Sequence, residues 1–305
     1  MKIAVIGAGA MGSIYAARFA QAGHSVVAID TWADHVDAIN THGLRVDGPA
    51  GKITAQGIVA SRDMTRATDC NLYIIATKGS GVGPAAQAIA QVNPNAQILT
   101  IQNGLGAAER LASHFPARQI MLGVADGFGA SMVGPGHAQH TAMKLIRLGC
   151  VGGGVDAHME QVARTWQSAG FDVECFDDID RLIWEKLLCN VTLSAPCCVF
   201  GCTVAQLLAD TDKWHIALGC MAEAFAVGQA MGIRFSFDDP VAYVTAFAKR
   251  VGAAKPSMLQ DHENGRKSEL DQINGAIAPL AEKAGLTAPY NATLSAVIRA
   301  REAAF

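Results

Sequence analysis

Three glycines near the N-terminus have the types and spacing of a phosphate-binding loop. Gly7, Gly9 and Gly12 form G-x-G-x-x-G between an apolar run of strand length and an alanine-rich stretch that Gly23 ends. In such a loop the first glycine permits a tight turn, the second admits a pyrophosphate, and the third lets helix and strand pack closely. Free N–H groups at the start of the helix then bind the phosphates. The predicted site of a nicotinamide or flavin dinucleotide comprises Gly7, Ala8, Gly9, Ala10, Met11 and Gly12.

An acidic residue, Asp30, follows the second predicted strand, residues 25–29. A carboxylate there accepts hydrogen bonds from the adenosine ribose 2′-OH and repels a 2′-phosphate. No Arg or Lys occurs from Ala28 to Leu44 to neutralise such a phosphate. We therefore expect NAD to be the preferred cofactor, with NADP as the alternative. Helix capping is a second, compatible role, because Thr31 and Asp34 have capping-box-like spacing.

Lys186 and Asn190 lie four residues apart on a predicted helix and so share one face. When hydride reaches a ketone, negative charge develops on the carbonyl oxygen. A positioned cation that can also give up a proton lowers that barrier electrostatically and as a general acid. Lys186 suits this role, and the amide of Asn190 can hold the same oxygen. The alternative is an ordinary solvated lysine beside a packed Trp184 and Leu187.

Two later segments carry polar side chains at helix starts. Ser257 is expected as the N-cap of its helix with Gln260 at N3, and its hydroxyl could also receive a carboxylate. Glu269 and Gln272 are expected one turn apart on the following helix, where Glu269 could hold a substrate hydroxyl. Capping alone explains Ser257 and Gln260 equally well.

Two polar residues follow predicted strands of the N-terminal half. Lys78 comes after the strand at 72–76, and Asn103 comes after the strand at 97–101. The carboxyl ends of parallel strands are where α/β sheets bind ligands. A turn role explains each residue equally well when it is taken alone.

Composition excludes several classes of protein. The chain has 305 residues, half of them hydrophobic, which is enough for a large core and two domains. A net charge of −3 without any basic run argues against nucleic-acid binding. No apolar stretch is expected to approach the roughly 20 residues that cross a bilayer, and the apolar N-terminus is interpreted as strand and phosphate loop. We expect a cytoplasmic protein with a small-molecule partner and no membrane contact, and the sequence leaves a homodimer open.

Eight scattered cysteines, without a signal sequence, are expected to be reduced. Four of them cluster between residues 189 and 202, but they lack paired C-x-x-C spacing and nearby histidines, so we expect apolar packing and no metal. The four are Cys189, Cys197, Cys198 and Cys202.

Short apolar runs alternate with helical stretches over the first half of the chain, which indicates a doubly wound parallel sheet. Residues 134–141 and 144–148 are expected as antiparallel additions, followed by a helix over 156–168 and a strand near 171–175. The apolar runs cover residues 3–6, 25–29, 72–76, 97–101 and 120–124.

From residue 179 onward the sequence shows only helical periods. The predicted fold class is therefore α/β, an N-terminal Rossmann-type doubly wound sheet followed by a C-terminal all-α domain. The dinucleotide domain is expected over residues 1–177 and the helical substrate domain over 178–305, with a hinge at the Asp-rich turn 177–180. The predicted helices cover 179–193, 204–208, 214–231, 240–251, 257–262, 268–284 and 291–300.

Taken together, these motifs resemble those of the ketopantoate reductase family in order and spacing, over essentially the whole chain. The resemblance implies a Rossmann domain joined to a helical domain similar to that of 6-phosphogluconate dehydrogenase relatives. The motifs are Gly7-Ala-Gly9-Ala-Met-Gly12, Thr77-Lys78, Gln102-Asn103-Gly104, Pro135-Gly-His137, Trp184-x-Lys186-x3-Asn190, Ser257-Met-Leu-Gln-Asp and Glu269-x-Asp-x-Ile-Asn-Gly.

The resemblance also implies the reaction, hydride transfer between a nicotinamide and a small 2-oxo or 2-hydroxy acid, with reduction of 2-dehydropantoate to pantoate as the leading candidate. It further implies a role for each matched polar residue. Lys186 and Glu269 are the implied catalytic residues: Lys186 is the general acid on the substrate carbonyl, and Glu269 contacts the distal hydroxyl. Ser257 is implied to contact the substrate carboxylate. Asn103 and Asn190 are implied to position cofactor and substrate, and Lys78 to lie on the cofactor side of the cleft.

Three departures from the family pattern bear on the substrate and cofactor. Ser194, which we still expect among the substrate-binding residues, stands where the family often has Asn, and Ala125-Asp126 replaces a Thr-Thr pair. Asp30 argues against the NADP preference that is common in the family.

A dehydrogenase of D-2-hydroxy acids with another side chain is therefore the alternative enzyme. A non-catalytic dinucleotide sensor is the alternative from a different class. The joint presence of Lys186, Asn190, Ser257 and Glu269 argues against a sensor, because a sensor needs no proton donor.

Overall fold

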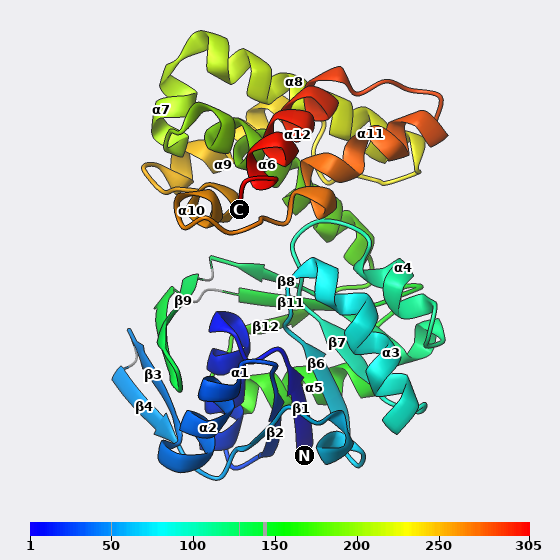
Figure 1. Ribbon diagram of the computed structural model, residues 1–305. Coiled ribbons are helices and arrows are strands. Elements are labelled where there is room, and N and C mark those ends of the chain that lie inside the picture. Colours follow the sequence, from blue (N-terminus) through cyan, green and yellow to red (C-terminus); the bar gives the residue numbers. More distant parts are fainter. Residues whose placement is uncertain (50, 128, 143–144) are drawn as a thin grey trace. The chain divides into compact units, whose positions relative to one another are not determined.

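An eight-stranded sheet organises the N-terminal part of the computed structural model, which describes residues 1–49, 51–127, 129–142 and 145–305 (Figure 1). Neighbouring strands are parallel except β8 and β11. From β5 to β8 the order is that of a doubly wound dinucleotide fold, and it reverses between β1 and β6. The order is β12 (Val173–Cys175), β11 (Leu145–Cys150), β8 (Ile120–Asp126), β7 (Ile98–Thr100), β6 (Leu72–Ile75), β1 (Lys2–Ile6), β2 (Ser25–Ile29) and β5 (Val59–Ser61).

The helices of this part follow local sequence rules. Helix α1 begins after Gly9, and the chain leaves it at Gly23, whose φ of 83° suits glycine. Asp156 caps α5, because its side chain accepts a hydrogen bond from the Met159 N–H. The helices are α1 (Ala10–Gln21), α2 (Ala33–His42), η1 (Met64–Ala67), η2 (Gly79–Gly81), α3 (Val82–Val92), α4 (Ala107–Ala112), η3 (Ala117–Gln119) and α5 (Ala157–Ser168).

A separate four-stranded sheet has the order β4 (Gly51–Ala55), β3 (Leu44–Gly48), β10 (His137–Ala142) and β9 (Gly129–Gly134). Helix α1 contacts all four of these strands as well as β1 and β2, so it lies between the two sheets (Figure 1). The sequence predicted an antiparallel addition near β10 but missed β3, β4 and the separate sheet. The predicted addition at 144–148 starts at Lys144, outside the described residues, and β11 covers its remainder.

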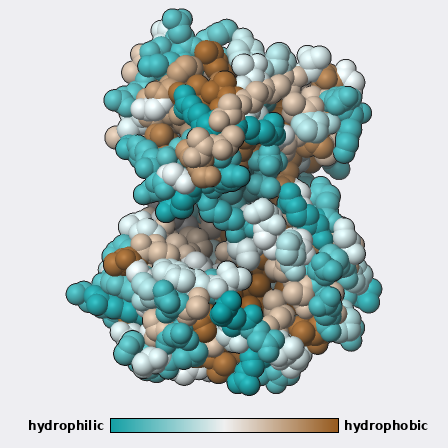
Figure 2. Space-filling model, in the orientation of Figure 1, coloured by the Kyte–Doolittle hydropathy of each residue, from teal (hydrophilic) through white to brown (hydrophobic). Residues whose placement is uncertain are grey.

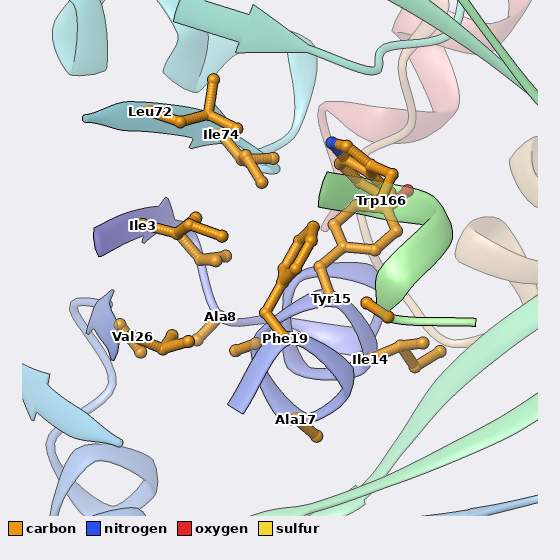
Figure 3. Packing of buried hydrophobic residues seen from close by; sticks show 14 of the residues in the cluster. Ile3, Ala8, Ile14, Tyr15, Ala17, Phe19, Val26, Leu72, Ile74 and Trp166 are labelled. Atoms are coloured by element: carbon orange, nitrogen blue, oxygen red, sulfur yellow. The ribbon is translucent and has the colours of Figure 1, made fainter. Parts of the chain in front are cut away.

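Aromatic packing joins α5 to α1 in the core of this part (Figure 3). Trp166 is fully buried, and its ring lies 4.9 Å from each of Tyr15, Phe19 and Phe171, in edge-to-face geometry. This arrangement suits the positive edges and negative faces of aromatic rings. The core thereby fixes the helix that begins at the glycine loop.

Residues 1–102 and 107–179 form one compact unit, hereafter the first unit, and residues 103–106 and 180–305 form a second unit. Within residues 103–106 and 180–305 the chain forms helices and turns but no strand. The elements are α6 (Ile179–Phe200), α7 (Val204–Ala209), α8 (Thr211–Ala230), α9 (Pro240–Val251), α10 (Ser257–Glu263), η4 (Leu270–Gln272), α11 (Asn274–Lys283) and α12 (Pro289–Glu302).

Helix α6 forms the centre of the second unit. Leu187, Leu188 and Val191 are fully buried in a cluster with residues of α8, α11 and α12. By length and composition alone, this helix of 22 residues could cross a bilayer. The expectation that no such apolar stretch exists is therefore wrong. Because 78% of its most apolar window is buried inside the protein, α6 has the character of a core helix.

Two helix predictions in this unit are wrong at their boundaries. Helix α6 continues past residue 193 to Phe200 and contains Pro196, which removes one backbone hydrogen bond from the helix. The helix predicted over 268–284 is broken at Ile273, whose φ of −110° and ψ of −105° are not helical.

On the face drawn in Figure 2, hydrophilic residues cover most of each unit and hydrophobic residues occur in small groups. The hydrophobic half of the composition is instead concentrated in the buried clusters of each unit. Buried hydrophobic clusters with hydrophilic residues on the drawn face are typical of a folded domain.

Candidate dinucleotide and substrate sites

At two positions of the glycine loop, no residue other than glycine fits. Gly7 has a φ of 87°, and a Cβ there would lie 2.8 Å from the Thr77 nitrogen at the end of β6. A Cβ on Gly12 would lie 1.9 Å from the Gly7 carbonyl oxygen. These contacts bring strand β1, helix α1 and strand β6 together at the point where the strand order reverses.

The loop also fits a bound dinucleotide. A Cβ on Gly9 would meet nothing within 4 Å, so the space in front of the loop is open. Helix α1 starts there without a side-chain cap, and first-turn N–H groups of a helix need external acceptors. Thr77 Oγ1 is buried beside the loop without a partner among the described residues. Phosphate oxygens satisfy such donors.

Two residues that sequence reasoning missed brace this loop from behind. Ser13 Oγ donates to the Ala8 carbonyl at 2.6 Å and lies 3.4 Å from His35 Nε2. His35 Nδ1 accepts from the Gly136 N–H at 2.8 Å, and burial lowers the pKa of the His35 imidazole. The neutral ring thus links the glycine loop to the turn between β9 and β10. The only sequence signal was the position of His35 on the buried side of its helix.

Asp30 is half-buried at the end of β2, and its Oδ1 accepts from the Trp32 N–H at 2.9 Å. Helix α2 has Trp32 as N-cap without a side-chain hydrogen bond, so the capping box expected from Thr31 does not form. A carboxylate has about four acceptor positions, which leaves room for ribose hydroxyls. The next Arg or Lys along the chain, Arg45, pairs with Asp47 at 2.7 Å.

The other predicted cofactor residue of the first unit is Lys78. It is exposed directly after β6 and Thr77, where it precedes η2. Gln102, at the end of the same unit, donates to the Ile75 carbonyl at 3.3 Å and so ties two strand ends together.

In the second unit, α6 carries Lys186 and Asn190 one turn apart, and both side chains are partly exposed. The amide of Asn190 makes no hydrogen bond to the described part of the chain. Between them lie the buried Leu187 and Leu188. The helix therefore presents an ammonium group and a free amide next to its buried faces.

Asn103 and Glu269 come together in the same unit. Asn103 Nδ2 donates to Glu269 Oε2 at 3.4 Å, and the neighbouring Leu105 N–H donates to the Gln272 carbonyl at 2.8 Å. Gly104 has a φ of 79°, and a Cβ there would lie 2.0 Å from that carbonyl oxygen. The expectation that Glu269 and Gln272 stand on one α-helix is wrong, because Glu269 precedes the short η4.

Ser257 is not an N-cap, contrary to the sequence prediction. It is the first residue of α10, whose N-cap is Pro256. The Gln260 side chain donates to the Lys255 carbonyl at 2.7 Å instead of closing a capping box. The exposed Ser257 hydroxyl makes no hydrogen bond to the described residues and is available to a ligand.

The two departures from the family pattern differ in their surroundings. Ser194 is only 4% exposed within α6. Asp126 accepts from Arg147 Nη1 at 2.5 Å across strands β8 and β11. Its charge is therefore compensated within the first unit, and it does not present a bare acid.

The cysteines are free thiols, and the four of the cluster between 189 and 202 are buried. Burial raises the pKa of Cys198 to about 11, and the pKa of Cys197 is also raised. Thiols of this kind are unreactive at neutral pH. Among the described residues no group of three or more His, Cys, Asp or Glu side chains is arranged to hold a metal ion.

A doubly wound dinucleotide sheet followed by a helical unit with a lysine, two amides and a carboxylate defines a nicotinamide-dependent oxidoreductase. The chain belongs to the ketopantoate reductase PanE/ApbA family: the family model matches residues 3–153, and the model of its C-terminal domain matches residues 178–302. The prediction of this family and fold class from the sequence is confirmed.

Several relatives match over nearly the whole chain. The 2-dehydropantoate 2-reductase of Streptococcus pyogenes serotype M6 is 28% identical over 305 residues, covering 99% of this chain and 98% of that protein. A ketopantoate reductase structure from Ralstonia eutropha JMP134 is 28% identical with a TM-score of 0.89, covering 99% and 98% of the two chains. A ternary structure of D-mandelate dehydrogenase with NADH and anilino(oxo)acetate is 27% identical with a TM-score of 0.89, covering 100% and 99%.

We expect Gly104→Ala to disrupt the pairing of Asn103 with Glu269. The new Cβ would collide with the Gln272 carbonyl oxygen, and the left-handed backbone costs an alanine about 1–2 kcal/mol. A side chain misplaced by ~1 Å lowers turnover on the order of 10²-fold. The measurement is kcat/KM for reduction of 2-dehydropantoate with NADH.

The matched control is Gly285→Ala, in the same unit, because Gly285 has a φ of 70° but open space around its Cβ position. It should carry the backbone strain without the loss of activity. Equal kcat/KM values for the two variants would show that the Gly104 contact does not position the site.

Proposed function

We propose that this protein reduces a small 2-oxo acid with NADH and that 2-dehydropantoate is its leading substrate. The observation that carries the proposal is the contact of Asn103 with Glu269 in the unit that also holds Lys186 and Asn190. Membership in a family of nicotinamide-dependent oxidoreductases supports the reaction class.

When bound, the nicotinamide supplies a hydride to the carbonyl carbon of the acid. As negative charge develops on the carbonyl oxygen, the Lys186 ammonium stabilises it and transfers a proton from Nζ, which gives the 2-hydroxy acid. The Asn190 amide donates to the same oxygen and fixes its direction. Solvent returns a proton to Lys186 before the next cycle.

The other polar groups suit the two ends of the substrate. The free hydroxyl of Ser257 can donate to the carboxylate at the start of α10. Glu269 accepts from the Asn103 amide through one oxygen and has acceptor capacity left for a distal hydroxyl. An aliphatic 2-oxo acid offers no donor for this remaining acceptor capacity, so it forgoes a hydrogen bond to a charged group of about 1.5–3 kcal/mol.

The cofactor preference rests on the surroundings of Asp30. Its carboxylate would accept from the ribose 2′-OH and repel a 2′-phosphate of about −1.5 to −2 charges. Arg45, the first Arg or Lys after it along the chain, is already paired with Asp47. NADH is therefore the proposed cofactor, as in the D-mandelate dehydrogenase structure.

A second candidate function is the dehydrogenation of a D-2-hydroxy acid with a different side chain. The similarity to D-mandelate dehydrogenase supports this candidate, and so does Ser194 in place of the family's Asn. The compensated charge of Asp126 weakens the case for a pocket remodelled by an added acid.

A substrate panel distinguishes the two candidates. With NADH, we expect kcat/KM for 2-dehydropantoate of about 10⁴ M⁻¹s⁻¹ or higher, which is ordinary for a natural substrate. 2-Oxobutyrate should be a poor substrate because it offers Glu269 no hydroxyl. A higher kcat/KM for phenylglyoxylate than for 2-dehydropantoate would favour the second candidate and overturn the first.

We expect kcat/KM to be higher with NADH than with NADPH. Asp30→Ala should narrow this ratio, because it removes both the ribose acceptor and the repulsion of the 2′-phosphate. Asp34→Ala, an exposed acid on α2, serves as the control and should leave the ratio unchanged. A tenfold preference of the unmodified protein for NADPH would contradict the assignment.

Lys186→Ala is expected to lower kcat about 10²-fold to 10⁴-fold through loss of the proton donor and the positive charge. NADH affinity, measured by fluorescence titration, should stay the same because the glycine loop and Asp30, which we assign to the dinucleotide, lie in the first unit. The control is Lys283→Ala, which removes an exposed lysine from α11. Near-normal single-turnover rates in Lys186→Ala would assign the proton transfer to another group.

A further inference from the structure

The hydrogen bonding of α6 is irregular just after Asn190. Pro196 has no N–H, so the Thr192 carbonyl lacks the donor that an α-helix normally supplies. The Thr192 hydroxyl donates back to the Leu188 carbonyl at 2.5 Å. Side chains therefore take part in the hydrogen bonding of the turn that follows the proposed substrate amide.

A side chain from another segment enters this turn. Asn274 Oδ1 accepts from the Ala195 N–H at 3.3 Å, and its Nδ2 donates to the Val191 carbonyl at 2.8 Å. In a regular α-helix the Ala195 N–H and the Val191 carbonyl bond to each other. The carboxamide of Asn274 thus hydrogen-bonds to the two backbone groups that a regular helix would pair with each other.

Asn274 is itself held in place. Its side chain is fully buried, and Nδ2 also donates to Asn291 Oδ1 at 2.9 Å. Asn291 Nδ2 in turn donates to the Cys220 carbonyl at 2.9 Å and to Glu223 Oε2 at 2.7 Å. Glu223 thereby anchors the network from α8. A buried polar chain of this kind is stable only when each member is satisfied, so it fixes one arrangement of its elements.

The position of Asn274 along the chain links the two groups of proposed substrate residues. It is the first residue of α11 and comes directly after the break at Ile273, five residues beyond Glu269. Its partners on α6, Val191 and Ala195, follow Asn190. The same carboxamide therefore connects the turn next to Asn190 with the segment that carries Glu269.

We propose that Asn274 is a positioning residue that sets the spacing between Asn190 on α6 and Glu269 before η4. This proposal rests on the proposed function, because it assigns those two residues to the carbonyl and distal ends of one substrate. Asn274 does not touch the substrate; it acts through the turn of α6. Removal of its carboxamide should impair binding of a substrate whose carbonyl must reach Asn190 while its distal hydroxyl reaches Glu269.

The test compares 2-dehydropantoate with 3,3-dimethyl-2-oxobutanoate, which lacks only the distal hydroxyl. In Asn274→Ala we expect kcat/KM for 2-dehydropantoate to fall at least tenfold and the ratio between the two acids to fall toward one. The Kd of NADH should stay unchanged. In Asn274→Asp, protonation of the buried carboxyl restores an O–H donor, so the ratio should recover at low pH relative to the alanine variant.

Ile298→Ala is the matched control, because Ile298 is fully buried in the same core but lies outside this network. Assayed below its unfolding temperature, this variant should retain the ratio of kcat/KM values for the two acids. If Asn274→Ala retains the ratio, or if Ile298→Ala loses it equally, Asn274 is a packing residue and the proposal is wrong. If Asn274→Ala does not fold, the aspartate variant decides through its pH dependence.

Amide hydrogen exchange separates failure of this proposal from failure of the proposed function. Asn274→Ala should change exchange at residues 187–195 selectively, while Ile298→Ala should not change that segment alone. Absence of 2-dehydropantoate reduction by the unmodified protein would overturn the proposed function. Unchanged exchange at 187–195 in Asn274→Ala would overturn the positioning role, whatever the substrate.

Discussion

Burial of α6 is the constraint on which the candidate substrate site depends. A helix packed on most of its faces cannot rotate without opening cavities, and close-packed cores resist such changes. Leu187, Leu188 and Val191 are fully buried, so the partly exposed positions of Lys186 and Asn190 are fixed by the packing of their neighbours. The same helix accepts the Asn274 side chain at its irregular turn. Packing therefore orients the residues that we assign to the carbonyl.

The two units position their candidate site residues by different kinds of contact. In the first, steric exclusion at Gly7 and Gly12 shapes a loop whose donors face open space, and the Ser13–His35 contact braces it. In the second, polar side chains from distant segments pair with one another, as Asn103 does with Glu269. Phosphate binding depends on backbone groups, whereas recognition of a small acid depends on side chains.

The features that could be predicted from the sequence are local ones. The glycine spacing, the apolar strands beside it and the helical periods after residue 179 are each contained in a short stretch, and they were enough for the fold class. The family followed from short motifs in order along essentially the whole chain. Strands β3 and β4 were missed because only two of the five residues of β3 and one of the five residues of β4 are buried, which weakens the apolar signal. Ser257 was misassigned as a cap because the helix starts one residue earlier than its hydroxyl suggested.

Long-range contacts had no comparable signal. Asn103 and Glu269 are 166 residues apart, and nothing in either segment predicts their contact. The break at Ile273 was missed although Asn274-Gly275, directly after it, is a turn-forming pair. Tertiary hydrogen bonds of Gln272 and Asn274 accompany the break.

Transfer of the hydride itself tests the account most directly. The protein would be incubated with 2-dehydropantoate and NADH that carries deuterium on the transferred side of its nicotinamide C4, and the product would be analysed by mass spectrometry and NMR. The account predicts pantoate with one deuterium at C2. Absence of a reduced product, or a product without deuterium at C2 from either stereoisomer of the labelled NADH, would contradict it.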